Sequence, residues 1–216
     1  MSTDKKKSPL TREFYLREAN IVAPELLGKL LVHRSVAGVT SGIIVEVESY
    51  IGPFDKGAHS YLNKRTARTE IQFGLGGYAY IYAIYGLHFC FNIVTNISGK
   101  PEVVLVRALE PVEGLELMCQ RRNTNNRTDL CSGPGKVCQA MGITKKLYGC
   151  NLCGDELYLE SLQNVNRGQI MISPRINIDY ADECKDYLWR YFIQGNPYVS
   201  KVAKQYRHQE RAYEVE

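Results

Sequence analysis

The stretch YAYIYAIYGLHFCFNIVT, residues 78–95, decides the fold of this chain. Its first six residues alternate strictly between tyrosine and small or aliphatic side chains, which is the two-residue period of a β-strand. A second strand is predicted over residues 88–95, after the short connection Tyr85-Gly86-Leu87. Two strands connected this closely form a hairpin, so the sheet is predicted to be largely antiparallel.

Other strands flank the hairpin in the sequence. Residues 41–50 (SGIIVEVESY) alternate like a strand that places Val45 and Val47 on one face and Glu46, Glu48 and Tyr50 on the other. A polar loop follows over residues 52–68. Further strands are predicted over residues 103–107, from residue 157 onward and over residues 170–178, and an aromatic segment covers residues 187–192.

Proline positions indicate the helices. One helix is predicted with Pro24 in or near its first turn, running through Leu30; another begins after Pro111, and a third runs from Pro134 through Met141. Strands and helices in this mixture indicate an α+β fold. Without internal repeats or linker-like segments, residues 11–216 are predicted to form one domain, preceded by a disordered basic tail over residues 1–10.

The composition is that of a globular protein. Hydrophobic residues make up 44% and charged residues 23% of the 216-residue chain, and no apolar stretch is long enough to span a bilayer. The polar, lysine-rich start lacks the apolar core of a secretory signal, so an intracellular protein with seven reduced cysteines is expected. The net charge of +4 permits nucleic-acid binding without demonstrating it.

Acidic residues on an apolar strand are the first candidates for chemistry. Glu46 and Glu48 lie about 7 Å apart along one strand face, with Tyr50 beside them and Arg107 on another predicted strand. A carboxylate in such a place can deprotonate a water molecule or face an oxocarbenium-like transition state. The alternative is the solvent-exposed face of a half-buried sheet.

Aromatic density is the second feature. Tyr78, Tyr80 and Tyr82 share one face of their strand, and Tyr85 lies at the hairpin tip. Stacked aromatic rings hold an extruded nucleobase, and a side chain at a hairpin tip can fill the gap that the base leaves in the duplex. The alternative is ordinary core packing of a tyrosine-rich strand. The basic loop over residues 63–68 could bind phosphates.

Other chemistries fit less well. Gly135-Lys136 resembles part of a phosphate-binding loop, but Leu130 and Val137 break the pattern. Cys150-x-x-Cys153 could hold zinc, although only this one pair has the right spacing. A metal-dependent nuclease using Glu46, Glu48 and Asp55 lacks a further ligand.

Taken together, these features resemble the alkyladenine (methylpurine, 3-methyladenine) DNA glycosylases of the bacterial and animal type. The resemblance is collinear over nearly the whole chain beyond the first ten residues. It is carried by LLGKLLV at 26–32, VEVESYIGPFDKGAHS at 45–60, YAYIYAIYGLHFCFNI at 78–93, VLVRALEPVEGLELM at 104–118, LCSGPGKVCQAMGI at 130–143, SPRI at 173–176 and RYFIQGNPYVS at 190–200.

The resemblance implies a role for individual residues. Glu48 matches the carboxylate that activates the attacking water, and Arg107 and the backbone carbonyl of Ile176 match groups that position it. Tyr50 and His59 match the pair that sandwiches the flipped base, and the His59 amide matches the donor that reads the six-position of the purine. Tyr82 matches the residue that completes the aromatic wall, and Asn92 matches the asparagine that crowds the two-amino group of guanine. Tyr85 matches the tyrosine wedged into the minor groove, with Leu87 and His88 beside it, and Thr66 falls in the DNA-contacting loop.

The resemblance also implies the reaction. A single α+β domain around a curved antiparallel sheet, described as an open barrel with a DNA-intercalating hairpin, is expected to act as a monomer on duplex DNA. It is expected to flip out alkylated or deaminated purines and hydrolyse the glycosidic bond without metal or organic cofactor. Expected substrates are 3-methyladenine, 7-methylguanine, hypoxanthine and ethenoadenine, and no membrane association is expected. The expected location is the nucleoid or cytoplasm of a bacterium, or the nucleus of a eukaryote. A catalytically inactive damaged-DNA binding protein of the same fold is the alternative.

Overall fold

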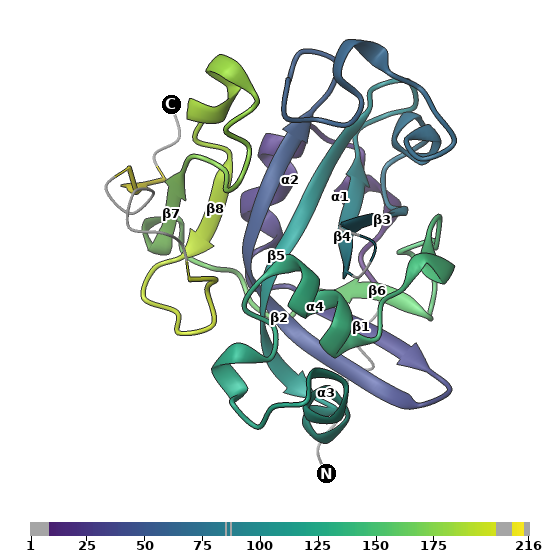
Figure 1. Ribbon diagram of the computed structural model, residues 1–216, viewed down its shortest axis with the longest axis vertical. Coiled ribbons are helices and arrows are strands. Elements are labelled where there is room, and N and C mark those ends of the chain that lie inside the picture. Colours follow the sequence, from purple (N-terminus) through teal and green to yellow (C-terminus); the bar gives the residue numbers. More distant parts are fainter. Residues whose placement is uncertain (1–8, 85, 87, 202–208, 214–216) are drawn as a thin grey trace.

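The computed structural model describes residues 9–84, 86, 88–201 and 209–213 as one domain built on a large, open antiparallel sheet (Figure 1). Seven strands form its main path in the order β3-β4-β5-β2-β8-β7-β9, and β1 and β6 continue from β2 as a branch. The strands are β1 Leu30–Ser35, β2 Gly38–Ile51, β3 Ala79–Ile84, β4 His88–Thr95, β5 Glu102–Glu113, β6 Leu157–Glu160, β7 Ile170–Ser173, β8 Arg190–Ile193 and β9 Arg211–Ala212.

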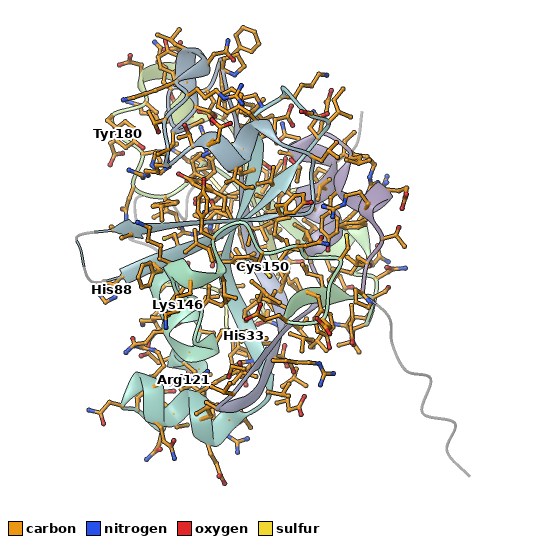
Figure 2. The ribbon with its side chains drawn as sticks, turned by 90° about the vertical axis from the view of Figure 1, so that its right-hand side faces the viewer. His33, His88, Arg121, Lys146, Cys150 and Tyr180 are labelled. Atoms are coloured by element: carbon orange, nitrogen blue, oxygen red, sulfur yellow. The ribbon has the colours of Figure 1, made fainter. Side chains whose placement is uncertain are left out.

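The predicted hairpin is present as β3 and β4, with Ala79 opposite Ile93 at one end and Ile84 opposite His88 at the other. It projects from the body of the molecule, and His88 lies at the molecular edge in the side view (Figure 2). Tyr85 and Leu87 lie outside the described residues. Each neighbouring pair of strands in the sheet is antiparallel, as predicted.

Two central strands, β2 and β5, are longer than the sequence pattern predicted, and their ladder contains β-bulges. Ile44 pairs with Leu109, Glu46 with Ala108 and Val47 with Val106, so Val45 and Arg107 are extra residues in their strands. The bulges break the predicted alternation: Ile44 and Val47, three residues apart, both join the main core. As the extra residue of its bulge, Arg107 has no residue paired with it on β2.

The helices are α1 Arg12–Tyr15, α2 Ala19–Leu26, α3 Leu115–Arg122 and α4 Pro134–Met141. The last begins at Pro134, as predicted, because a proline at the first helical position has no hydrogen bond to lose. The prediction for Pro24 was wrong. Helix α2 starts at Ala19, five residues before that proline, because Ala19, Val22, Ala23 and Leu26 are buried against the core. Leu30 already pairs with Ile43 in the sheet.

The helix predicted to begin after Pro111 is α3, which starts at Leu115; β5 first continues through Pro111, which pairs with Gly42, to Glu113. One other predicted boundary was wrong. The strand predicted over residues 170–178 ends at Ser173. Pro174 follows it, and the Ile176 amide donates to a side chain instead of to a ladder.

The sheet separates a core from a pocket. Helices α2 and α4 pack against one face with Leu31, Phe91, Ile93, Val104, Val106 and Leu109. A smaller cluster around Tyr80, Val94 and Val103 lies apart from that core. Successive side chains of β4 and β5 therefore point alternately toward the core and toward the pocket. Within the described residues, no helix is long and apolar enough to cross a membrane.

The predicted N-terminal tail over residues 1–10 lies mostly outside the described residues. Of its last residues, Pro9 forms a bridge with Glu160, and the Leu10 amide donates to the Leu159 carbonyl at 2.7 Å. The chain therefore joins the edge of β6 just before α1.

Candidate active site

Glu48 lies at the centre of a buried hydrogen-bond cluster on β2. Its Oε2 accepts from the Tyr50 hydroxyl at 2.8 Å and from Arg107 Nη1 at 3.2 Å. Its Oε1 accepts from the Ile176 amide at 2.8 Å. The side chain is fully buried, which excludes the alternative of a solvent-exposed acidic face. All three partners donate, so both oxygens of this carboxyl group are hydrogen-bond acceptors.

Glu46 holds Arg107 from the other side. Arg107 Nε donates to Glu46 Oε1 at 3.0 Å, and Arg190 Nε donates to the same oxygen at 2.7 Å. The Ser200 amide and hydroxyl donate to Glu46 at 2.7 and 2.8 Å. Burial alone raises the pKa of Glu46, but the two guanidinium groups and these hydrogen bonds lower it below its ordinary value. Glu46 is therefore an ionised anchor that orients Arg107 toward Glu48.

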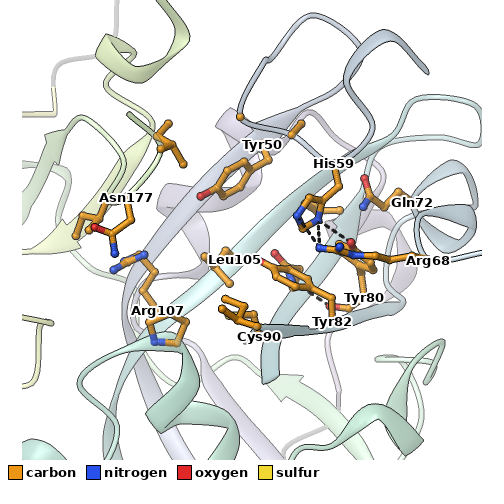
Figure 3. A pocket seen from close by; sticks show the side chains of 18 of the residues that line it. Tyr50, His59, Arg68, Gln72, Tyr80, Tyr82, Cys90, Leu105, Arg107 and Asn177 are labelled. Atoms are coloured by element: carbon orange, nitrogen blue, oxygen red, sulfur yellow. Dashed lines mark hydrogen bonds between the residues drawn. The ribbon is translucent and has the colours of Figure 1, made fainter. Parts of the chain in front are cut away.

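A pocket of about 420 Å³ opens above this cluster (Figure 3). Tyr50 and His59 both line it, and Tyr82 meets His59 edge to face with ring centroids 4.6 Å apart. Burial and the Glu48 charge raise the pKa of Tyr50 well above its ordinary value, so its hydroxyl keeps the proton that it donates to Glu48. A pocket of this size with aromatic walls suits a flat ring system such as a nucleobase.

The His59 ring is neutral in this environment. Burial lowers its pKa to about 4, and the charges of Arg68 and Lys64 add to the effect. Its Nε2 accepts from Arg68 Nη2 at 2.7 Å, and its Nδ1 lies 2.8 Å from the Tyr80 hydroxyl. Since an arginine only donates, Nε2 is the acceptor and Nδ1 carries the proton. The backbone amide of His59 has no hydrogen-bond partner among the described residues.

Arg175 supports Tyr50 from behind. Its guanidinium lies 4.6 Å from the centroid of the Tyr50 ring and 5.0 Å from that of Trp189, so it is layered between the two. The guanidinium also forms a bidentate pair with Asp55, and Asp55 accepts from the Gly57 amide at 2.8 Å. The pair therefore connects the Tyr50 strand, the loop that carries His59, and the segment that carries Ile176.

Asn92 lies in the floor of the pocket on β4. It pairs with Tyr80 on one side and Leu105 on the other, and Leu105 in turn pairs with Glu48. Asn92 and Glu48 are thus two strands apart in one row, about 10 Å from each other. The Asn92 amide nitrogen donates to the Tyr80 carbonyl at 3.1 Å, which fixes the orientation of the side chain.

The structure gathers the predicted catalytic and base-binding residues around one pocket. Six of them line it: Tyr50, His59, Tyr82, Asn92, Arg107 and Ile176. Glu48 lies directly behind three of these lining residues rather than at the pocket surface. The Ile176 amide contacts Glu48, and the predicted contact of its carbonyl with a water molecule stays a prediction.

The predicted DNA-contacting residues lie around the pocket rather than in it. Thr66 is exposed on the loop before η2 (Glu70–Phe73), and its amide and hydroxyl contact the Thr69 hydroxyl at 2.9 and 3.2 Å. His88 is exposed at the start of β4. Figure 2 shows Tyr180, His88 and Arg121 along one edge of the molecule. The roles of Thr66 and His88 stay predictions, and those of Tyr85 and Leu87 fall on positions outside the described residues.

Sequence reasoning missed several residues in and behind the pocket. Arg175, which lies against the Tyr50 ring, was only part of a matching stretch, and the lining residues Gln72 and Asn177 carried no signal. Arg68 was seen only as one basic residue of a phosphate-binding loop, yet it lines the pocket. Asp55, considered as a metal ligand, is instead bound on both oxygens by Arg175. Within the described residues, no group of three or more His, Cys, Asp or Glu side chains is arranged to hold a metal ion.

An open antiparallel sheet with a buried carboxylate behind an aromatic-walled pocket is the arrangement that the resemblance to the alkyladenine DNA glycosylases implied. The family model described as "Methylpurine-DNA glycosylase (MPG)" matches residues 13–197. The chain therefore belongs to the methylpurine-DNA glycosylase family, whose members are hydrolases of DNA base-excision repair.

Similar proteins match this chain over nearly their whole length. Proteins from Clostridium acetobutylicum, Desulfitobacterium hafniense and Natranaerobius thermophilus, each named "Putative 3-methyladenine DNA glycosylase", are 49%, 47% and 48% identical to this chain. The matches cover 90%, 88% and 88% of this chain and 98% of each relative. The resemblance seen in the sequence is confirmed at the level of the family.

Proposed function

We propose that this protein removes modified purines from duplex DNA by hydrolysis of the N-glycosidic bond, with Glu48 activating the attacking water. The observation that carries the proposal is the position of Glu48 directly behind a pocket bounded by Tyr50, His59 and Tyr82. The product is an abasic site.

Flipping the base out of the duplex is the first step. Extrusion costs a few kcal/mol, and less for a damaged or mispaired base. Stacking on an aromatic side chain returns about 1–3 kcal/mol per base. In our proposal Tyr50 and His59 supply that stacking, and the residues at the end of the β3–β4 hairpin fill the gap in the duplex.

Bond cleavage is the second step. As the bond to the base breaks, positive charge develops on the deoxyribose, and the Glu48 carboxylate stabilises it. Glu48 takes a proton from water while the resulting hydroxide forms the new bond to the sugar carbon, and the base leaves with the bonding electron pair. No lysine lines the pocket within the described residues, so direct hydrolysis is favoured over a Schiff-base route.

Access of water to Glu48 requires a small rearrangement. Oε2 accepts two hydrogen bonds and Oε1 accepts one, so Oε1 keeps a lone pair for the water. The carboxylate has no exposed surface in the free protein. We propose that entry of the base displaces the Tyr50 hydroxyl or the Ile176 segment and admits the water.

Asn92 supplies selectivity in this proposal. Its amide is fixed by the Tyr80 carbonyl, so it cannot turn away from an incoming base. The two-amino group of guanine would therefore meet a rigid obstacle, whereas purines without that group would not.

The decisive experiment is a panel of duplexes, each holding one lesion, with base release detected by chemical cleavage of the abasic site. Wild-type protein should release at least one modified purine, with EDTA present throughout. Glu48→Gln should keep its affinity for DNA and lose about 10²–10⁴-fold in single-turnover rate. Binding without release by the wild-type protein would instead indicate an inactive damaged-DNA binding protein. Parental release by Glu48→Gln would remove Glu48 from the role.

A further inference from the structure

The charged side chains in and beneath the pocket are balanced, with one exception. Three buried carboxylates, Glu46, Glu48 and Asp55, are bound by three buried guanidinium groups, those of Arg107, Arg190 and Arg175. A fourth arginine, Arg68, also lines the pocket. Among the described residues it has no carboxylate partner. The pocket wall therefore carries one uncompensated positive charge.

Arg68 is directed to the rings of the pocket. Its guanidinium lies 4.9 Å from the centroid of the Tyr82 ring, and its Nη2 donates to His59 Nε2 at 2.7 Å (Figure 3). Arg65, three residues earlier in the same loop, instead forms a bidentate pair with Glu70 and stays outside the pocket. The loop thus pairs one arginine with a carboxylate and presents the other to the base site.

Gln72 adds a second donor beside Arg68. It is 1% exposed and lines the same pocket, and its Nε2 has no hydrogen-bond partner. A buried donor without an acceptor costs free energy unless a ligand satisfies it. On this side of the pocket Arg68 offers only donors and the unpaired Gln72 Nε2 adds another, whereas His59 Nε2 is already occupied. An occupant with acceptor atoms and no positive charge complements this wall.

We propose that Arg68 is a specificity-determining residue that favours neutral purines with a carbonyl or ring-nitrogen acceptor over purines made cationic by alkylation. The inference rests on the proposed function and deepens it. Arg68 is exposed, but its guanidinium is held against the pocket by its contacts with His59 and Tyr82. There it repels a second cation and accepts no hydrogen bond. Moreover, Arg68 already occupies a face of Tyr82 that would otherwise attract a cationic base.

The test compares two duplexes that differ in one base: hypoxanthine, which is neutral and carries a six-oxo acceptor, and 7-methylguanine, which is cationic in DNA. Single-turnover rates are measured at saturating enzyme, so that differences in DNA affinity do not contribute. Arg68→Gln keeps donors and removes the charge. It should raise the ratio of the 7-methylguanine rate to the hypoxanthine rate by about fivefold or more. Arg68→Lys should keep the ratio within about twofold of the wild type, since the charge is retained.

Arg65→Gln is the matched control, because it removes an arginine charge from the same loop outside the pocket; its ratio should equal that of the wild type. An equal fall of both rates in Arg68→Gln, with a weaker salt dependence of DNA binding, would assign Arg68 to a phosphate and overturn the inference. An unchanged ratio would overturn it as well. If the wild-type protein released neither base nor any other lesion of the panel, the proposed function would fall first.

Discussion

Asp55→Asn should destabilise the protein strongly, because it leaves the buried guanidinium of Arg175 without its counter-charge. Asp55 is fully buried and Arg175 is 1% exposed. Asp55 Oδ1 accepts from Arg175 Nη2 at 2.7 Å, and its Oδ2 accepts from Nη1. Removal of one partner from a buried ion pair costs about 3–5 kcal/mol. For a domain of this size, that loss lowers Tm by about 6–20 °C.

The assay is urea unfolding followed by fluorescence and by far-UV circular dichroism. Trp189 is the single tryptophan of the chain, and its ring lies 5.0 Å from the Arg175 guanidinium. Its emission therefore reports on this pair directly. The matched control is Asp182→Asn, which makes the same substitution in an ion pair with Lys56 whose aspartate side chain is 72% exposed. A pair this exposed contributes about 1 kcal/mol or less.

The double variant Asp55→Asn/Arg175→Met separates a missing charge from a missing contact. It removes both charges of the pair and should be more stable than Asp55→Asn alone, because no charged group is then left buried without a partner. If the free energy of unfolding of Asp55→Asn lay within about 1 kcal/mol of the wild-type value, the pair would not be what holds these segments together. A double variant as unstable as the single would show that geometry, rather than charge, sets the cost.

Three further predictions concern the pocket. Tyr50→Phe keeps the ring and loses the 2.8 Å hydrogen bond to Glu48, so its single-turnover rate should stay within about tenfold of the wild-type rate. Tyr50→Ala should lose the stacking as well. A loss of rate in Tyr50→Phe as large as that in Glu48→Gln would contradict this prediction. Asn92→Ser should increase release of undamaged guanine, measured by mass spectrometry, and unchanged discrimination would remove Asn92 from that role. Burial and the Arg68 charge lower the pKa of His59 to about 4, so the unfolded state binds more protons between about pH 6.5 and 4, and stability should fall as the pH falls through that window. Urea unfolding of His59→Gln should show a shallower fall, and parallel curves for the two proteins would refute the linkage.

The sequence alone was sufficient for much of this protein. The tyrosine alternation of residues 78–83 and the short connection after it predicted the β3–β4 hairpin, because strand period and turn length are local properties. The collinear match to the methylpurine-DNA glycosylases, confirmed as family membership, named Glu48, Arg107, Tyr50, His59 and Asn92 in advance. A collinear family match can point to the residues of one site even when their positions lie far apart along the chain.

The tertiary structure decided how those residues are held. Arg107 reaches Glu46 and Glu48 because it is the extra residue of a bulge, and bulges arise from pairing between strands rather than from local sequence. Arg175 lies 120 residues from Asp55 in the chain, so no periodicity could indicate that they form a pair. The ends of α2 and of β7 were misjudged for the same reason: burial and long-range hydrogen bonds outweighed the local signal of a proline or an apolar run. Local patterns determine which elements form, but the partners of a buried charge are settled only when distant segments meet.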